Sequence, residues 1–210
     1  VQYAVTFGDY QALFLDTNEP GVSWGVFCQE RADWLRARLQ ESTAPVLIFM
    51  HHPFFPIGIR SMDSISLRDT AAFMGAIQGQ EHRIRHVFFG HIHRPILGTF
   101  RGIPYSTLRG TNHQVALDLQ GDATCIIGSH EQAQYGVVQL SSEQILIHIE
   151  DYLDCEQRLA RFDSASGTDG RPVRVRAAQK LRHVIGFLVR ARQHADYVGA
   201  AAHGIAESRG

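Results

Sequence analysis

Histidines follow two apolar segments of the chain, and imidazole is the side chain that most often binds a metal ion in proteins. His51 and His52 follow the apolar stretch PVLIFM, and His91 and His93 lie in GHIH directly after the apolar stretch VFF. In an extended segment, residues two apart point the same way, so His91 and His93 are expected to converge on one site. First-row ions such as Zn, Mn, Fe and Co accept imidazole, so the pattern predicts a metal centre.

The two histidine elements differ in what their spacing allows. His51 and His52 are adjacent and would point in opposite directions in an extended chain. We therefore expect one of them to bind metal, and the other to hydrogen-bond a ligand or to support the site. An isolated His-x-His pair is most often a surface or core feature of a soluble protein. Two histidine elements at the ends of consecutive strands favour a metal site instead.

The elements around the histidines predict how the chain brings them together. Residues 45–50 and 87–89 are expected to be buried strands, with a Pro-rich loop and a helix over 66–77 between them. A strand, helix, strand order makes two parallel neighbours in one sheet. The carboxyl edge of such a sheet is where ligands usually bind, so both histidine elements should face one crevice.

The remaining segments predict a mixed α/β chain. Residues 3–7 and 11–15 are expected to be two strands joined by a turn, and 30–40 an amphipathic helix. Beyond Pro95 the sequence changes to short strands in an antiparallel meander. These strands are expected over residues 96–100, 103–108, 114–119, 124–127, 136–140 and 145–152.

Composition sets limits on the class of protein. With 210 residues, of which 44% are hydrophobic, the chain can bury a real core, and its net charge of -1 gives no general attraction to nucleic acid or membrane surfaces. No segment approaches the roughly 20 apolar residues of a membrane span. The three cysteines are widely spaced and form no CxxC, which fits a reduced compartment, so we expect a cytoplasmic protein.

The histidine motifs and their flanks resemble a known family. The stretch VLIFMHHPFFPIGIRSMDSISLRD is followed by GHIHRP, RGTNHQVALDL and YGVVQL, in an order and spacing that resemble the calcineurin-like metallophosphoesterases. More narrowly, they are similar to the bacterial class III cyclic-nucleotide and glycerophosphodiester phosphodiesterases. The resemblance covers about residues 5 to 155. It implies a layered α/β/β/α sandwich that hydrolyses phosphodiesters.

The resemblance also implies roles for individual histidines. In that family the first His of HHP and both His of GHxH bind metal, which corresponds to His51, His91 and His93. The His of the family's GT-x-HQ element contacts substrate phosphate, which corresponds to His113, and His52 is expected on the substrate side as well. The implied cofactor is a pair of first-row metal ions, divalent or of mixed valence (Fe, Mn, Zn or Co), which activate a water molecule. The implied substrate is a small phosphodiester, and no nucleic-acid polymer is expected as a partner.

Three elements of the family pattern are missing at the places where the resemblance requires them. The family's DxH, GD and GNH[DE] elements precede HHP, whereas this chain contains no Asp-x-His, and its Gly8-Asp9 and Gly121-Asp122 lie in the wrong context. We therefore interpret residues 1–163 as the C-terminal portion of a metallophosphoesterase domain whose N-terminal half is missing. We also expect that the apolar strands lose partners, so that the 210-residue chain alone is weakly stable and inactive.

The last part of the sequence differs in character. From Ser164 onward there are eight Lys/Arg and three Asp/Glu, whereas the preceding residues are acidic overall. We interpret 164–210 as a flexible linker followed by a basic helical extension, because 175–198 has helix-like spacing. The alternative to a hydrolase is a non-catalytic, His-only metal-binding or scaffolding remnant of the same fold. The sequence leaves a homo-oligomer open.

Several other residues near the motifs have a structural and a functional interpretation. Asp16 is expected to be a turn residue rather than a ligand. Arg68 could pair with phosphate or form a salt bridge at a helix start, and Asp63 flanks the same loop. Arg94 is expected at the surface or supporting a ligand, and the cysteines are expected to be inert.

Overall fold

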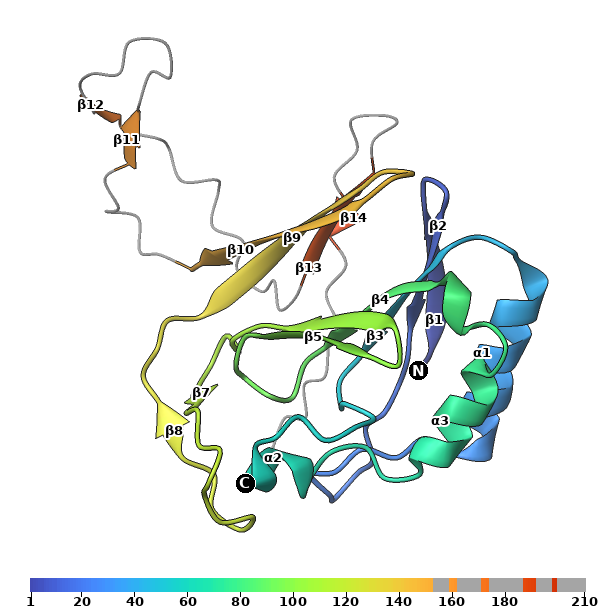
Figure 1. The fold of residues 1–210 in the computed structure, drawn as a ribbon, viewed down its shortest axis with the longest axis horizontal. Helices are drawn as coiled ribbons and strands as arrows, with labels where there is room; N and C mark the ends of the chain where they lie inside the picture. The colour runs from blue at the N-terminus through green and yellow to red at the C-terminus, as the bar shows by residue number, and fades with distance from the viewer. Residues whose placement is uncertain (153–158, 162–170, 174–186, 192–197, 200–210) are drawn as a thin grey trace.

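A six-stranded sheet forms the centre of the computed structural model (Figure 1). The structure describes residues 1–152, 159–161, 171–173, 187–191 and 198–199. Along the sheet the strand order is β1-β2-β3-β4-β6-β5. The strands are β1 (Tyr3–Phe7), β2 (Tyr10–Phe14), β3 (Val46–Met50), β4 (Ile84–Phe89), β5 (Ile96–Phe100) and β6 (Ile103–Thr107).

The middle of this sheet is parallel. Strands β2, β3, β4 and β6 run in one direction, while β1 and β5 are antiparallel edge strands. All five residues of β3 are buried, as expected of a strand with parallel neighbours and both faces covered. The expectation that β3 and β4 lose strand partners is wrong. The second strand of the β1–β2 hairpin pairs with β3, and β6 returns to pair with β4.

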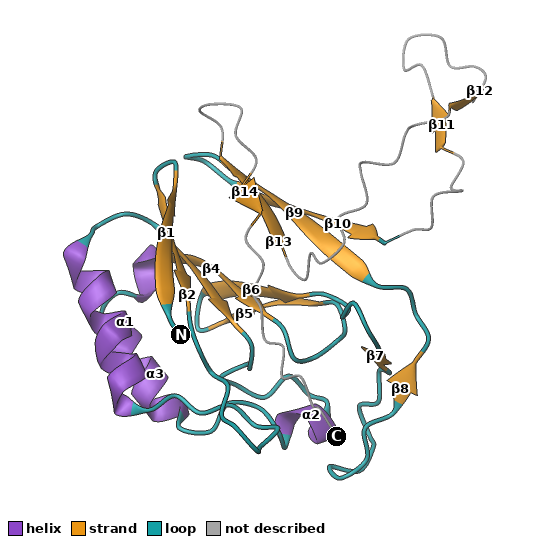
Figure 2. Ribbon diagram, turned by 180° about the vertical axis from the view of Figure 1, so that it is seen from behind, coloured by secondary structure: helices purple, strands orange, loops and turns teal. Residues whose placement is uncertain are grey.

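Helices cover one face of the sheet. Helices α1 (Gln29–Glu41) and α3 (Thr70–Ile77) pack together on this face (Figure 2). The apolar residues of α1 recur at helical spacing and are buried, which confirms the predicted amphipathic helix. The helix predicted over 66–77 begins only at Thr70, because Asp69 has a positive φ of 39°. Short α2 (Arg60–Asp63) and a 3-10 turn (Glu81–Arg83) were not predicted.

A second sheet covers the opposite face, which gives helix, sheet and sheet layers (Figure 2). Strands β9 (Gln134–Leu140) and β10 (Ile145–Asp151) form its antiparallel hairpin. Val138 and Leu140 of β9 pack on a row of stacked aromatic rings that crosses the central sheet with one ring per strand. The rings lie 4.5–4.6 Å apart between centroids and belong to Tyr3, Phe14, Phe49 and Phe88. This layering agrees with a mixed α/β fold.

Between β6 and β9 in the sequence, the chain forms a small two-stranded antiparallel sheet of β7 (Gln114–Val115) and β8 (Gly128–Ser129). The strands predicted over 114–119 and 124–127 are therefore wrong for most of their length. The apolar side chains of these segments are exposed, so burial does not favour a longer ladder there. The exposed aliphatic residues are Leu117, Leu119, Ile126 and Ile127.

The predicted helical extension is not confirmed. Its described residues are strands: β13 (Phe187–Ala191) pairs with β9, and β14 (Val198–Gly199) pairs with β13. The segment "FLVRA" contains aromatic and β-branched residues that suit a strand beside β9. Two further short strands, β11 (Leu159–Arg161) and β12 (Arg171–Val173), pair with each other. The rest of the predicted linker and helix lies outside the described residues.

Within the described part of the chain, no helix combines the length and the apolar character that crossing a bilayer requires.

Candidate metal centre

The predicted histidines lie at the edge of the central sheet where its parallel strands end. His51 directly follows β3, and His91 follows β4 after Gly90. Thr17 lies shortly beyond β2, and Gly110 shortly beyond β6. Because these four strands are parallel, their carboxyl ends meet at one edge, as the sequence pattern predicts.

Three histidines form a compact group at this edge. His51, His52 and His91 each offer a ring nitrogen, and these nitrogens all lie within 4.8 Å of one another. The ring centroids are 4.7 Å apart for His51 and His52, 5.1 Å for His51 and His91, and 4.3 Å for His52 and His91. A Zn–N bond measures about 2.0–2.1 Å, so two nitrogens on one ion lie no more than about 4.2 Å apart. Small side-chain movements would bring the group to that separation.

His52 is held by protein atoms at both ring nitrogens. Its Nδ1 lies 2.9 Å from the hydroxyl of Thr17, and its Nε2 lies 3.3 Å from the carbonyl oxygen of Ser23. A carbonyl oxygen only accepts, so Nε2 carries the proton and Nδ1 accepts from Thr17. The backbone N–H of His52 also donates to the Thr17 hydroxyl, at 3.3 Å. His52 therefore has no free lone pair in this conformation, and the contacts favour a supporting role for it.

His91 presents the opposite case. Its Nε2 is buried, and no described residue hydrogen-bonds it. A buried polar atom without a partner costs free energy, so in a native structure it needs an explanation. In this conformation the neighbouring imidazole of His51 is the group with which such a nitrogen would share a metal ion, while His52 supports the group. The unpaired nitrogen therefore marks the group as a candidate metal site.

Burial keeps these imidazoles neutral. Burial is the main cause that lowers the pKa of His91 to about 2, and the neighbouring histidines lower it further. A hydrogen bond with the backbone of Ile65 raises it in part. Burial also lowers the pKa of His51 to about 3, helped by the charges of His52 and His93. Burial also lowers the pKa of His52 to about 4, although its hydrogen bond to the carbonyl of Ser23 raises this pKa in part. Metal binding requires the neutral form, so the site is prepared to bind a cation at neutral pH.

Glycines give the rings their space. A Cβ at Gly25 would lie 2.6 Å from the ring of His52, and a Cβ at Gly90 would lie 2.8 Å from Nδ1 of His51. A Cβ at Gly110 would lie 2.9 Å from Nδ1 of His93. Real Cβ atoms do not approach so closely, so a larger residue at Gly25 or Gly90 would displace a ring of the group. Each loop of the site thus contains a glycine for a steric reason.

The GHIH loop is a tight turn rather than an extended segment. His91 and His93 have φ values of 62° and 50°, and the Ile92 N–H donates to the carbonyl of Gly90 at 2.6 Å. The extended conformation predicted for this segment is therefore wrong. Left-handed backbone at two non-glycine residues costs free energy and occurs mostly at functional sites. The fully buried Ile92 packs against Met62 and anchors the turn.

His93 lies beside His113 rather than in the group of three. Its Nδ1 is 2.7 Å from the carbonyl oxygen of His113, and the two rings are 4.3 Å apart between centroids. It is close enough to the other site histidines that its charge lowers the pKa of both His51 and His91. The structure thus brings together two adjoining parts of one site: the group of His51, His52 and His91, of which His52 is buried and the others are half-buried, and the pair of His93 and the exposed His113.

The other candidates have structural partners. Asp16 accepts from the backbone N–H of Asn18 at 3.0 Å, as a turn residue does. Asp63 accepts from two backbone N–H groups of its own loop. The guanidinium of Arg68 lies over the ring of Trp24, 3.7 Å from its centroid. No ion pair of Arg68 is found in the described part of the chain, so the predicted salt bridge is not observed.

Sequence reasoning missed two residues that hold His52. Thr17 is buried and supplies the hydroxyl on Nδ1, while Ser23 supplies the carbonyl on Nε2. A signal for Thr17 existed, because it follows a buried strand at the same edge as the histidines. No signal pointed to Ser23, since a backbone carbonyl carries no side-chain identity.

The fold and the site together define a class. A layered α/β fold with neutral imidazoles at the carboxyl edge of its parallel strands is compatible with a metallophosphoesterase. The donor set also suits a first-row metal ion, because buried neutral imidazoles surround an unpaired nitrogen.

Comparison with known proteins agrees with this class. The chain is 41% identical over 152 residues to a protein of Rhodopseudomonas palustris named "probable cyclic nucleotide phosphodiesterase", a match that covers 70% of the chain and 55% of that protein. It is 34% identical over 110 residues to a "probable glycerophosphodiester phosphodiesterase" of Arcobacter nitrofigilis, which covers 52% of the chain and 40% of that protein. It is 30% identical over 114 residues to a "cAMP/cGMP dual specificity phosphodiesterase" of Mycobacterium tuberculosis, a match that covers 53% of the chain and 35% of that protein.

These relatives confirm the resemblance that the motifs predict: the chain is similar to bacterial proteins that are named phosphodiesterases. No model of a protein family matches the chain. The chain spans about half the length of the curated relatives it matches, or less.

Proposed function

We propose that this chain carries part of the active site of a metal-dependent phosphodiesterase. Its substrates would be small phosphodiesters of the 3′,5′-cyclic nucleotide or glycerophosphodiester type. The observation that carries the proposal is the group of His51, His52 and His91 at the carboxyl edge of the sheet, in a chain homologous to phosphodiesterases. The unpaired Nε2 of His91 supports a metal ion there rather than a structural cluster.

The proposed ligands are His51, His91 and His93, and the proposed cofactor is a pair of first-row metal ions (Fe, Mn, Zn or Co). When bound, these ions supply Lewis-acid polarisation of the phosphate and lower the pKa of a water molecule from about 15.7 to about 7. The histidines contribute by burial, because it keeps their nitrogens unprotonated at neutral pH. His52 orients the group through its bonds to Thr17 and Ser23.

His113 is the proposed contact to the substrate phosphate. Its side chain is exposed, and its ring lies 4.3 Å from that of His93 between centroids, so it stands at the solvent side of the site. A phosphate oxygen held between the group of three and His113 would have an imidazole donor on its open side. The exposed position also suits a small diester that enters from solvent.

A second candidate is a His-only metal-binding or scaffolding module without hydrolysis. The group found in the described part of the chain contains imidazoles and no carboxylate. Carboxylates would reduce the positive charge of bound ions and fix their geometry. Without one, three imidazoles can still hold a single Zn ion. The sequence-based expectation that the 210-residue chain alone is inactive stays a prediction.

The two candidates differ in turnover and not in metal binding. We would purify the chain and measure bound metals, and then follow hydrolysis of bis(p-nitrophenyl) phosphate with added Mn²⁺. His91→Asn serves as the site variant, because Asn tolerates the positive φ at this position. His82→Asn is the matched control on an exposed histidine outside the site. Mn²⁺-dependent turnover that is lost only in His91→Asn supports the hydrolase and contradicts the expectation that the chain alone is inactive. Bound metal without turnover, both in the chain alone and in a longer protein that contains it, supports the second candidate.

The proposed domain organisation has residues 1–163 as one portion of a metallophosphoesterase domain and 164–210 as a separate basic extension. The described strands of the first portion form the central sheet and the β9–β10 hairpin, whereas β13 and β14 of the second portion extend that hairpin into a four-stranded sheet. Limited proteolysis with mass spectrometry would test the proposed boundary. A protected fragment that ends near residue 163 would support it, and protection that extends through 187–191 would contradict it.

A further inference from the structure

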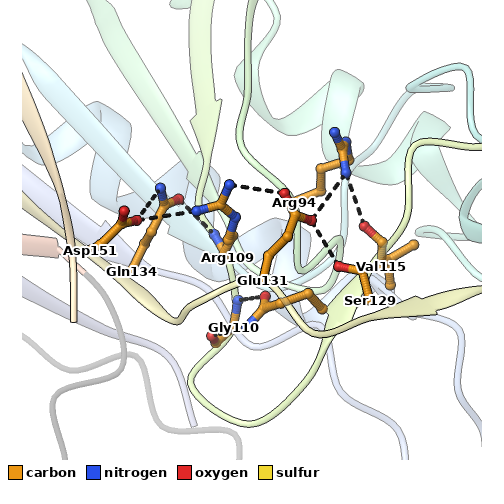
Figure 3. A network of polar contacts seen from close by, with 9 residues as sticks. Arg94, Arg109, Gly110, Val115, Ser129, Glu131, Gln134 and Asp151 are labelled. Carbon is orange, nitrogen blue, oxygen red and sulfur yellow. Dashed lines mark hydrogen bonds and ion pairs between the residues drawn. The ribbon is translucent and has the colours of Figure 1, made fainter. Parts of the chain in front are cut away.

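A network of ion pairs connects the two loops that carry His93 and His113 (Figure 3). Glu131 lies at its centre. One carboxylate oxygen is 2.9 Å from a guanidinium nitrogen of Arg109, and the other is 3.5 Å from a guanidinium nitrogen of Arg94. Ser129 donates to the same carboxylate at 2.8 Å, and this hydrogen bond is the main cause of the lowered pKa of Glu131. One carboxylate thus holds two arginines from different loops.

Both arginines adjoin the site in sequence. Arg94 directly follows His93, and it also donates to the carbonyl of Val115 at 3.2 Å. Arg109 directly precedes Gly110, where the His113 loop begins. The network therefore joins the end of the GHIH turn to both ends of the loop over residues 110–115.

The loop itself is closed by Gln114. Its side-chain oxygen accepts from the N–H of Gly110 at 2.8 Å, and its amide donates back to the carbonyl of Gly110 at 2.7 Å. Val115 N–H donates to the carbonyl of His93 at 3.3 Å. These bonds make the loop a rigid unit whose position relative to His93 depends on its anchors.

The position of this loop favours one tautomer of the neutral His93 ring. Nδ1 of His93 lies 2.7 Å from the carbonyl oxygen of His113. A carbonyl oxygen only accepts, so Nδ1 carries the proton and Nε2 keeps its lone pair. A hydrogen bond to a carbonyl at one ring nitrogen is the usual way in which a protein prepares the other nitrogen for a metal.

We propose that Glu131 is a positioning residue for His93: by holding Arg94 and Arg109 together it keeps the His113 carbonyl on Nδ1, which leaves Nε2 of His93 free to bind a metal ion. The role of His93 as a metal ligand rests on the proposed function, whereas the effect of Glu131 on which ring nitrogen of His93 carries the proton does not. Exposed ion pairs contribute little to global stability, so the loss of Glu131 should shift the loop without unfolding the chain. A shift of a few tenths of an ångström is enough to weaken a hydrogen bond of this length.

The test measures the ring directly. In the full 210-residue chain, ¹⁵N-labelled on histidine and kept metal-free at pH 8, long-range ¹H–¹⁵N spectra report which ring nitrogen carries the proton. His93→Gln identifies the His93 signals. We expect the Nδ1–H form in the unaltered chain and a mixture of both forms in Glu131→Ala. Glu131→Gln keeps an acceptor but loses the charge, so its share of the Nδ1–H form of His93 should lie between those of the unaltered chain and Glu131→Ala.

Asp151→Ala is the matched control. Asp151 is also paired with Arg109, at 3.1 Å, but no contact between it and Arg94 is found among the described residues. This variant removes an exposed carboxylate from the same network without separating the two loops. We expect the His93 ring to stay in the Nδ1–H form.

Zn²⁺ affinity gives a second measurement. Loss of an outer partner of a metal-binding histidine typically weakens metal binding by 10–100-fold, so we expect roughly tenfold weaker Zn²⁺ binding in Glu131→Ala by isothermal titration. An unchanged ring in Glu131→Ala, with a melting temperature close to that of the unaltered chain, would overturn the proposal. A changed ring with unchanged Zn²⁺ affinity would keep the positioning role and contradict the assignment of His93 as a ligand. If Glu131→Ala fails to fold, Glu131→Gln and Arg94→Gln carry the same test.

Discussion

The buried histidine group and the pair nearer to solvent are positioned by different means. His51, His52 and His91 follow parallel strands whose register is fixed by the sheet, and His52 is also held by the Thr17 hydroxyl and the Ser23 carbonyl. His93 and His113 depend on a turn and a loop that an exposed ion-pair network connects. One half of the site is therefore as stable as the core, while the other depends on contacts that water and salt weaken.

This difference suggests a division of work within one site. A group whose ring nitrogens cannot move far suits a metal ion, which needs fixed distances. His113, on a loop that exposed ion pairs anchor, suits the side of the site that a substrate enters and leaves, and His93, a proposed ligand, connects the two halves. Each of the following predictions alters one half and leaves the other as the comparison.

The largest effect should come from pH, through the buried group. The folded-state pKa values are about 3 for His51 and about 2 for His91, and about 4 for the separately buried His86, against an ordinary value of 6.5. Below pH 6.5 the unfolded chain binds protons that the folded chain excludes, so stability present above that pH falls as the pH decreases toward 4. Each histidine contributes a slope of up to about 1.4 kcal/mol per pH unit.

Urea unfolding at pH 7.5, 6.5 and 5.5 in EDTA, followed by circular dichroism, would measure this slope. His82→Asn, on an exposed histidine, should leave the slope unchanged, whereas His86→Phe should reduce it. A free energy of unfolding that stays constant down to pH 5.5 would show that the buried imidazoles are not held neutral.

Removal of His91 should have the next largest effect, on metal binding alone. His91→Asn keeps a residue that accepts positive φ but removes the unpaired Nε2. We expect Zn²⁺ affinity to fall by about 100-fold, since one of few ligands is lost. Isothermal titration would compare the Zn²⁺ affinity of His91→Asn with that of His113→Asn, because the second variant alters only the solvent-side pair. Equal losses in both variants would mean that the two halves do not differ in their role toward metal.

The sequence predicted the buried half of the site well. Apolar strands that end in histidine, with a helix between them, require parallel neighbours and a common edge, and the structure has both. The amphipathic pattern of α1 and the first hairpin were predicted for the same reason: burial imposes a period on the sequence. The resemblance in motifs was confirmed by the relatives.

The solvent-side half was predicted less well, because its contacts leave no period in the sequence. Positive φ at His93, and at His91 in the adjoining half, followed from no local rule, since neither residue is a glycine. Apolar alternation over 114–127 suggested longer strands, but the exposed Leu117 and Leu119 show that no layer covers them. Glu131 is distant in sequence from both arginines that it holds, so only the fold reveals the network. The ligand roles of His51, His91 and His93 stay predictions.

A side chain added at Gly25 should lower the free energy of unfolding by a moderate amount, because it crowds the buried group. A Cβ there would lie 2.6 Å from the ring of His52, so Gly25→Ala must displace that ring. Overpacking of this kind costs typically about 1–3 kcal/mol, and we expect a loss in that range by urea unfolding. Gly75→Ala in helix α3 is the matched control, because nothing lies within 4 Å of its Cβ. It should stabilise the chain by about 0.5–1 kcal/mol, and a loss there similar to that of Gly25→Ala would remove the steric explanation.

The smallest effect should come from the hydroxyl that holds His52. Thr17→Val keeps the shape of the side chain but removes the donor to Nδ1 and the acceptor of the His52 N–H. Both groups are buried, so the expected loss is about 1–2 kcal/mol, with only a minor effect on Zn²⁺ affinity because His52 supports the group. Thr99→Val, at an exposed position of β5, is the matched control and should change the free energy of unfolding by less than about 0.5 kcal/mol. If Thr17→Val instead lowered Zn²⁺ affinity as much as His91→Asn, His52 would have to be counted among the metal ligands, and the group of three would act as one unit.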